Sequence, residues 1–320
     1  MHTLAIRSIR TAALLLTLGT LAGCAIGSPP YQARSKQESQ ALQLTNASLL
    51  MGLRDAEAPK DGSTPGSNAD FAKASAFGTL NALSPPPGFT SVTAGALGFA
   101  SMFFTGGGAE EISRTSKLLV WMPRSEAATA DEAWQKLNTL VQHELAAVLA
   151  ETPLPSGYTL EKEDRQVTGY RPGISFAPTP YKSTQAIWHI RGGDCDQPKV
   201  QCGYEVRLRL PPVERTAPAV LGGYPAWTYI RTEGMIEIPS SFTDHREFRA
   251  KTRAMFPDME VLRKLSMRLP NWAFIYVAPN AMGYSDKASG KPVLLRFPVV
   301  LNKGEPLYFV RGATGVAPTS

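Results

Sequence analysis

The chain has 320 residues, of which 43% are hydrophobic and 19% are charged, and its formal net charge is +6. A chain of this length and apolar content is able to bury a core and to form one large or two modest domains. Two of the positive charges, Arg7 and Arg10, lie in an N-terminal leader, and the remaining bias is too small to indicate nucleic-acid binding.

The first 23 residues have the organisation of a secretory signal. Arg7 and Arg10 lie near the start, Ala12 to Leu18 form a short apolar run, and the small residues Ala22 and Gly23 precede Cys24. This order of basic region, apolar region and small-residue cleavage site is typical of exported proteins. The apolar run is too short to span a bilayer as a helix.

The sequence Leu21-Ala22-Gly23-Cys24 resembles the lipobox of bacterial lipoproteins. The resemblance covers residues 1–23 and implies cleavage before Cys24, diacylation of its sulfur and acylation of its amine, for instance with palmitate. Ala25, where an Asp would favour the inner membrane, implies lipid anchoring in the outer membrane, facing the periplasm. Two or more acyl chains suffice for stable attachment. An ordinary secretory signal with Cys24 as a small apolar residue is the alternative.

Cys195 and Cys202 are the two remaining cysteines of an exported chain. An even pair in an oxidising compartment predicts a disulfide bond. A zinc site is the alternative, but two further ligands are lacking nearby in the sequence, so we expect neither a metal nor a cofactor.

Residues 24–70 are predicted to form an acylated tether and linker. Gly27, Pro29 and Pro30 follow the proposed anchor, and Pro59 to Asn68 are rich in turn-forming residues. Helix-forming residues between Arg34 and Glu57 permit a helix within this flexible N-terminal stalk.

Residues 71–115 form an unusually apolar segment that we expect to be helical. Val92 to Phe104 carries almost no charge and is too short to cross a bilayer. The segment is either buried against the main domain or exposed as a surface for lipid or a protein partner. The candidate interface residues are Leu97, Phe99, Met102, Phe103 and Phe104.

The folded region is predicted to span residues 116–320 and to begin with a buried strand at Lys117 to Met122. Thr129 and Glu132 form a capping-box pattern at the start of a helix. Its apolar positions recur at intervals of three and four and predict one buried face: Trp134, Leu137, Val141, Leu145 and Val148. A strand is expected next, at Tyr158 to Lys162.

Gln185 to Arg191 and Tyr204 to Leu210 alternate between apolar and polar residues, which predicts two strands flanking the cysteine pair. The inward positions are Ala186, Trp188, Ile190, Tyr204, Val206, Leu208 and Leu210. The outward positions His189, Arg191, Arg207 and Arg209, beside Glu205, form a candidate anion-binding face for lipid phosphate, a glycan carboxylate or an acidic partner. A charged, solvated sheet face is the alternative.

The remaining elements are predicted after a Pro- and Gly-rich turn between Pro211 and Pro225. They are strands at 226–231, 273–277, 293–297 and 306–310, and helices at 242–256 and from Asp258 to Leu269. The halves 116–212 and 226–320 then share a β-α-β-β-β order, so the two halves are either a duplicated unit or parts of one α+β domain. The expected fold is α+β, with helices covering one face of a mostly antiparallel sheet.

No established catalytic motif is present in the sequence. His143-Glu144 begins the metalloprotease pattern His-Glu-x-x-His, but Ala147 replaces the second His. We therefore expect a non-catalytic outer-membrane lipoprotein that binds or assembles another envelope protein. A cell-wall or carbohydrate hydrolase using carboxylates such as Asp194 and Asp196 is the alternative, since two such acids need proximity in space only.

Overall fold

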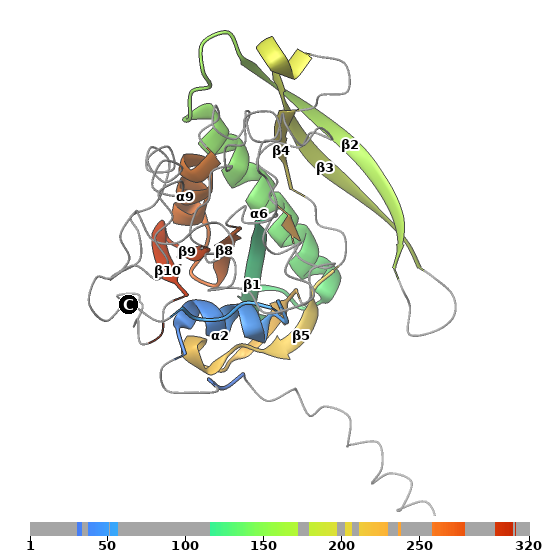
Figure 1. Cartoon of the computed structure of the whole chain (residues 1–320). Coiled ribbons are helices and arrows are strands. Elements are labelled where there is room, and N and C mark those ends of the chain that lie inside the picture. The colour runs from blue at the N-terminus through green and yellow to red at the C-terminus, as the bar shows by residue number, and fades with distance from the viewer. Residues whose placement is uncertain are drawn as a thin grey trace, which may run out of the picture.

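The computed structural model of the chain describes residues 31–33, 38–50, 52–56, 116–171, 179–196, 202–206, 211–229, 236–237, 258–278, 298–309 and 311. The helices and strands of these residues form an α+β fold with two antiparallel sheets (Figure 1). The α+β class expected from the sequence is confirmed. Within this part of the chain, no helix has the length and apolar character needed to cross a membrane.

The larger sheet contains most of the strands, and all its pairings are antiparallel. Its order is β10 (Glu305–Tyr308), β9 (Val299–Asn302), β8 (Ala273–Val277), β1 (Lys117–Pro123), β6 (Pro225–Thr228) and β5 (Val213–Thr216), with β7 (Ile236–Glu237) also paired to β1. The smaller sheet has the order β2 (Thr159–Arg171), β3 (Thr179–Arg191) and β4 (Cys202–Glu205).

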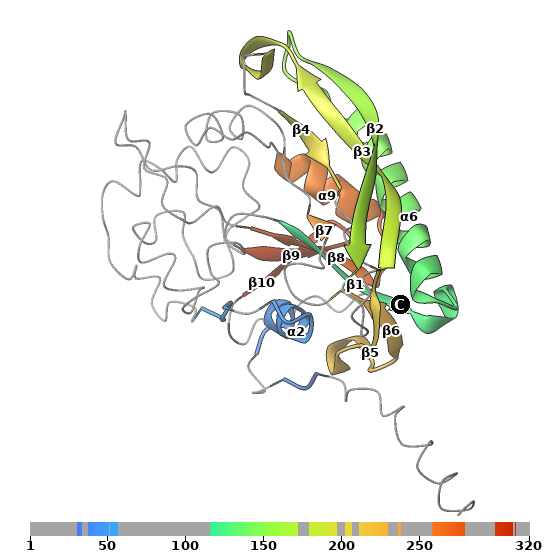
Figure 2. The ribbon, with the colours of Figure 1, turned by 90° about the vertical axis from the view of Figure 1, so that its right-hand side faces the viewer.

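The described residues also form three α-helices: α2 (Gln40–Ala47), α6 (Ala130–Ala150) and α9 (Asp258–Arg268). Short 3-10 helices are η1 (Arg124–Glu126), η2 (Gly193–Asp196) and η3 (Ala219–Leu221). Figure 2 shows α9 and α2 on opposite sides of the larger sheet. Helices α6 and α9 contact each other, and α2 lies on the side of the larger sheet opposite α9.

Strand β1 is the centre of the larger sheet because it pairs with β6 and β7 on one edge and with β8 on the other. Each of its residues 118–122 is at most 1% exposed to solvent. A strand that is covered on both faces requires a continuous apolar run, and Leu118 to Met122 supply one. The strand predicted at Lys117 to Met122 is confirmed.

Helix α6 follows the predicted capping pattern closely. The Thr129 hydroxyl accepts a hydrogen bond from the Glu132 N–H at 3.1 Å, and the Glu132 carboxylate accepts one from the Ala128 N–H at 2.8 Å. These bonds satisfy backbone donors that the first turn of a helix leaves without partners. The predicted inner face is confirmed, since all five of its apolar residues are buried.

Helix α2 belongs to the folded body, which corrects the expected extent of the tether. Ala41, Leu44 and Leu50 are completely buried in the common core, and Ala56 exchanges backbone hydrogen bonds with Phe309 and Arg311. The helix is capped by the Ser39 hydroxyl, which itself donates to the Asp55 carboxylate. The described residues between 31 and 56 therefore contribute to the core, although the sequence assigned them to a flexible stalk.

The two halves of the folded region do not form two separate sheets. Strand β1, from the first half, lies between β6 and β8 of the second half, whereas β2, β3 and β4 all come from the first half. Because β1 is hydrogen-bonded into the sheet of the second half, cutting the chain between the halves would expose its apolar faces. The halves 116–212 and 226–320 are thus interdependent.

Most of the other expected elements are confirmed where the structure describes them. Strands β6, β8 and β10 and helix α9 overlap their predicted ranges. Strand β5 lies where only a turn was expected, and β9 begins after the strand predicted at 293–297. Residues 293–297, the helix predicted at 242–256, the apolar segment 92–104 and Cys24 lie outside the described residues.

Candidate functional site

The smaller sheet is fastened at one end by the predicted disulfide bond between Cys195 and Cys202. The two Cα atoms are 5.6 Å apart, which lies within the usual range for a disulfide. Cys202 lies opposite Ile190 in the β3–β4 ladder, and both cysteines are buried. The bond thus connects η2, which follows β3, to the first residue of β4.

The inner face of this sheet carries the side chains that the alternating pattern predicted. Ala186, Trp188, Ile190, Tyr204 and Val206 are all buried, which confirms the inward positions within the described residues. The outer face differs from expectation near β4. Ile187 and Glu205 face each other across the ladder and are 1% and 5% exposed. The outer face is therefore covered at β4 and open toward β2.

The open part of the outer face carries five ionisable residues that we call the charged ladder: Glu161, Glu163, Arg165, His189 and Arg191. His189 Nε2 lies 2.7 Å from Glu163 Oε2, and Arg191 Nε donates to Glu161 Oε2 at 3.0 Å. Arg165 Nε donates to the other Glu163 oxygen at 3.2 Å. Positive and negative groups thus alternate across the two strands.

The electrostatics of the charged ladder bear on the anion-binding hypothesis. The hydrogen bond from His189, with a second from Arg165, lowers the pKa of Glu163 below its usual value. His189 and Arg191 each already contact a carboxylate of β2, so an anion would have to displace Glu161 or Glu163. Anion binding at this face stays a prediction. Arg207 and Arg209, the other members of that predicted face, lie outside the described residues.

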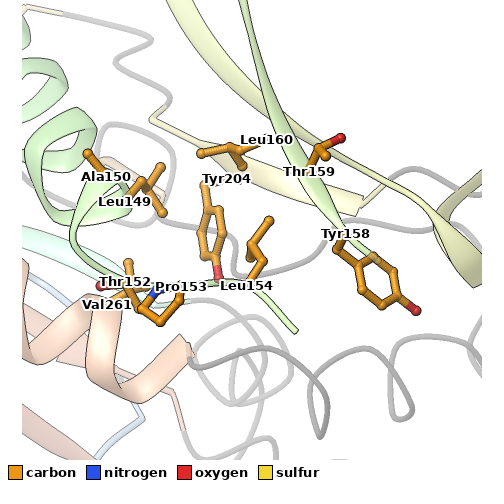
Figure 3. A pocket seen from close by; sticks show the side chains of 10 residues that line it. All are labelled: Leu149, Ala150, Thr152, Pro153, Leu154, Tyr158, Thr159, Leu160, Tyr204 and Val261. Atoms are coloured by element: carbon orange, nitrogen blue, oxygen red, sulfur yellow. The ribbon is translucent and has the colours of Figure 1, made fainter. Parts of the chain in front are cut away.

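A cavity of about 200 Å³ lies behind the inner face, between the end of α6, the start of β2, β4 and α9 (Figure 3). Its lining combines apolar side chains with the hydroxyl-bearing residues Thr152, Thr159, Tyr158 and Tyr204. In Figure 3 the Tyr204 ring lies among Leu149, Leu154 and Leu160. The lining residues are Leu149, Ala150, Thr152, Pro153, Leu154, Tyr158, Thr159, Leu160, Tyr204 and Val261.

The cavity is small, and the described residues that line it are uncharged. Pockets that enclose a small-molecule ligand usually measure roughly 300 to 1,000 Å³. None of its ten lining residues is a carboxylate, histidine, cysteine, lysine or arginine, so the lining offers no general base of ordinary pKa and no charged group to stabilise a transition state.

The polar groups near the cavity connect α6 to α9. Lys264 Nζ donates to the Glu151 carbonyl at 3.2 Å and to the Thr152 hydroxyl at 3.3 Å. Arg268 Nη2 donates to Glu151 Oε1 at 2.6 Å. Two cations therefore lie at the C-terminal end of α6, where the helix dipole is negative. These contacts stabilise the helix pair beside the cavity.

Glu144 and Asp196, two of the residues considered for catalysis, take part in local structure. Glu144 contacts Arg268, and the side chain of His143 is 76% exposed. Asp196 accepts a hydrogen bond from the Gly192 N–H at 3.0 Å and closes the turn after β3. Among the residues that the structure describes, no group of three or more His, Cys, Asp or Glu side chains is placed to bind a metal ion.

The sequence did not reveal the acidic half of the charged ladder or the lining of the cavity. Glu161, Glu163 and Arg165 alternate with period two, which is a strand signal, but the intervening Lys162 and Asp164 are also charged and conceal it. Glu, Lys and Asp are in addition depleted in strands. The cavity joins residues from four elements, and their proximity depends on tertiary packing.

No protein-family model, no curated protein and no solved structure matches this chain. Its function is therefore argued from its own residues. The described residues provide an exposed charged surface on the smaller sheet, which the disulfide fastens, and a small cavity lined by uncharged side chains.

Proposed function

We propose that this chain is a lipid-anchored outer-membrane lipoprotein that binds another protein of the cell envelope without catalysing a reaction. Acylated Cys24 holds the protein to the membrane, and the folded body faces the periplasm. The partner is expected to contact the body and the apolar residues Leu97, Phe99, Met102, Phe103 and Phe104. The single observation that carries the proposal is the Leu21-to-Cys24 sequence, because it assigns both the anchor and the compartment.

Two features of the folded body support this proposal. The Cys195–Cys202 disulfide fits an oxidising compartment. The charged ladder presents exposed groups of both signs. Groups of alternating charge on a rigid sheet favour recognition of a complementary protein surface. A hydrolase would instead require two carboxylates facing each other in a cleft.

The anchor is tested by mass spectrometry of the mature N-terminus. The native protein is expected to begin at Cys24 and to carry three acyl chains. A Cys24→Ser chain should remain unacylated and leave the membrane fraction. A native protein that begins elsewhere, or that carries no fatty acid, overturns the assignment of both anchor and compartment.

The partner is tested by site-specific photo-crosslinking of the full acylated chain in its membrane. A photoreactive residue replaces Glu161 in the charged ladder or Phe103 in the apolar segment, and Met267, which is exposed on α9, serves as the control position. We expect one envelope protein to be crosslinked from position 161 or 103 and not from 267, and the reciprocal experiment to recover this chain. Failure at both positions contradicts the binding proposal.

A further inference from the structure

Strand β2 has one paired edge and one edge that no described strand pairs. It joins β3 through a ladder of residue pairs from Thr159↔Arg191 to Arg171↔Thr179 and is the terminal strand of its sheet. Residues 161–166 are exposed. Figure 1 shows β2 at the outer side of the three-stranded sheet, and Figure 2 shows the same hairpin facing the viewer. An unpaired edge presents a row of N–H and C=O groups to another strand.

The geometry of antiparallel pairing restricts how this edge could pair with itself. Along one strand, the N–H and C=O groups of successive residues point alternately to the two edges. Two residues that lie opposite each other in an antiparallel ladder either both direct these groups toward the partner strand or both direct them away from it. Two copies of β2 that meet edge to edge therefore pair residues whose numbers differ by an even amount. One residue of β2 must then lie directly opposite its own equivalent in the second copy, with the two-fold axis midway between the two.

The charges of β2 favour one such register. With the axis at Glu163, Glu161 lies opposite Arg165 of the partner copy and Lys162 lies opposite Asp164 of the partner copy. Two-fold symmetry repeats both pairs, so four oppositely charged cross-strand pairs flank the axis. Opposite charges facing each other across strands are stabilising, and like charges are destabilising.

The neighbouring registers are less favourable. With the axis at Lys162, this lysine faces its own equivalent and Glu161 faces Glu163. With the axis at Asp164, Glu163 faces Arg165, but two aspartates meet at the axis and Lys162 faces an uncharged glutamine. The pattern of β2 is thus complementary to itself about Glu163 and not about the adjacent residues.

The one like-charged pair in the favoured register has its charge balanced within each copy. The two Glu163 side chains meet at the axis, and each already contacts His189 Nε2 at 2.7 Å and Arg165 Nε at 3.2 Å. His189 is well covered, with 12% of its side chain exposed. The local cations offset the repulsion between the two glutamates at the centre of the interface.

We propose that β2 pairs antiparallel with β2 of a second copy of this chain, with Glu163 on the two-fold axis. The two smaller sheets then form one sheet in the order β4-β3-β2-β2-β3-β4. Charged residues on an edge strand usually prevent pairing with other strands; here they also select the identical strand in one register. This inference goes beyond the proposed function and does not depend on it.

Charge exchange at Lys162 and Asp164 tests the register. Lys162→Asp places aspartate opposite Asp164 of the partner, and Asp164→Lys places lysine opposite Lys162, so each variant alone should dimerise about 10-fold more weakly than the original chain. In a heterodimer of the two variants, residue 162 of each chain lies opposite residue 164 of the other and both pairs are oppositely charged, so a mixture of the variants should form heterodimers. The chain that carries both substitutions should dimerise like the original. Sedimentation velocity of the full chain in nonionic detergent measures these equilibria.

The results separate the proposal from its alternatives. A chain that sediments as a monomer at all concentrations overturns it, and so does a dimer that is insensitive to both single substitutions. Because Lys162 Nζ also lies 3.0 Å from Asp164 of its own strand, thermal unfolding of each variant controls for a folding defect. Recovery of the dimer on mixing excludes such a defect directly.

Cysteine crosslinking in the membrane provides a second measurement. Glu163→Cys places two thiols opposite each other across the axis, at a Cβ separation of about 5 Å, and should yield a disulfide-linked dimer. Glu161→Cys and Arg165→Cys should crosslink when the two variants are mixed and much less when each is alone, because each lies four residues from its equivalent, or roughly 13 Å. Equal crosslinking at positions 161 and 163 overturns the register.

Discussion

Strands β1 and β2 differ in almost every physical respect, although both are long strands of the same chain. Residues 118–122 of β1 are covered on both faces, whereas the Glu161 and Glu163 side chains of β2 are 62% and 45% exposed. Burial of apolar side chains is the main source of folding free energy, and exposed charges contribute little to it. The larger sheet therefore supplies most of the stability, and the smaller sheet supplies accessible chemical groups.

The largest expected effect comes from a cavity in the larger sheet. Leu119 is completely buried and lies opposite Phe274 in the β1–β8 ladder. Leu119→Ala removes apolar contacts and leaves a void, so the free energy of unfolding should fall by about 3 kcal/mol. Glu161→Ala in β2 is the matched control and should change it by less than about 0.5 kcal/mol. Urea denaturation measures both, and similar losses would remove the contrast between the sheets.

The second effect concerns the disulfide that fastens the smaller sheet. A bond that closes a loop of this length stabilises the folded state by about 2.5 kcal/mol in the chain-entropy model. The variant Cys195→Ala with Cys202→Ala should lose roughly that amount, and amide exchange should increase in β4 more than in β1. The unsubstituted chain treated with a reductant should behave in the same way. Uniform loosening of both sheets would indicate that the disulfide stabilises the whole body.

Elements with a strong local signal could be predicted from the sequence. Strand β8 has its predicted bounds, because Ala273 to Val277 form a continuous apolar run. Helix α6 was found because its apolar period and the Thr129 cap agree. The Cys195–Cys202 bond followed from counting cysteines in a chain that the sequence predicts to be exported. In each case the physical cause lies within a few residues.

The remaining features depend on partners that are distant in the sequence. Strand β2 extends to Arg171, far beyond the predicted Tyr158-to-Lys162 range, because β3 supplies a hydrogen-bonding partner along its entire length. The contact between Glu163 and His189 requires the register of β2 against β3, which the sequence pattern does not fix. The burial of Glu205 was missed because alternation assigns a residue to a face of the sheet but does not reveal what covers that face.

A smaller effect is expected at the start of α6, the helix that runs from the end of β1 to the cavity beside β2. Thr129→Ala removes the hydroxyl that accepts the Glu132 N–H and should reduce the free energy of unfolding by about 1 kcal/mol. Thr129→Ser keeps the hydroxyl and should remain close to the original stability. If the alanine and serine variants unfold at the same urea concentration, the cap contributes nothing measurable.

The smallest effect concerns the pH dependence of the charged ladder. The pKa of Glu163 is lowered from its usual value of 4.5, chiefly by the hydrogen bond with His189. A carboxyl group whose pKa is lower in the folded state stabilises that state above its unfolded pKa, and this contribution disappears as the pH falls through the folded pKa. Pairing of β2 with β3 should therefore weaken below about pH 4.5.

NMR titration of the Glu163 carboxyl measures this effect directly. In His189→Ala the first cause of the shift is absent, so the pKa of Glu163 should rise toward its usual value, although Arg165 keeps a second hydrogen bond. Arg191→Ala is the control, because Arg191 bonds Glu161 and not Glu163. A Glu163 pKa that is unchanged in His189→Ala would mean that Arg165 alone lowers it. The contact between Glu163 and His189 would then add nothing to the pairing of β2 with β3 beyond what the backbone hydrogen bonds provide.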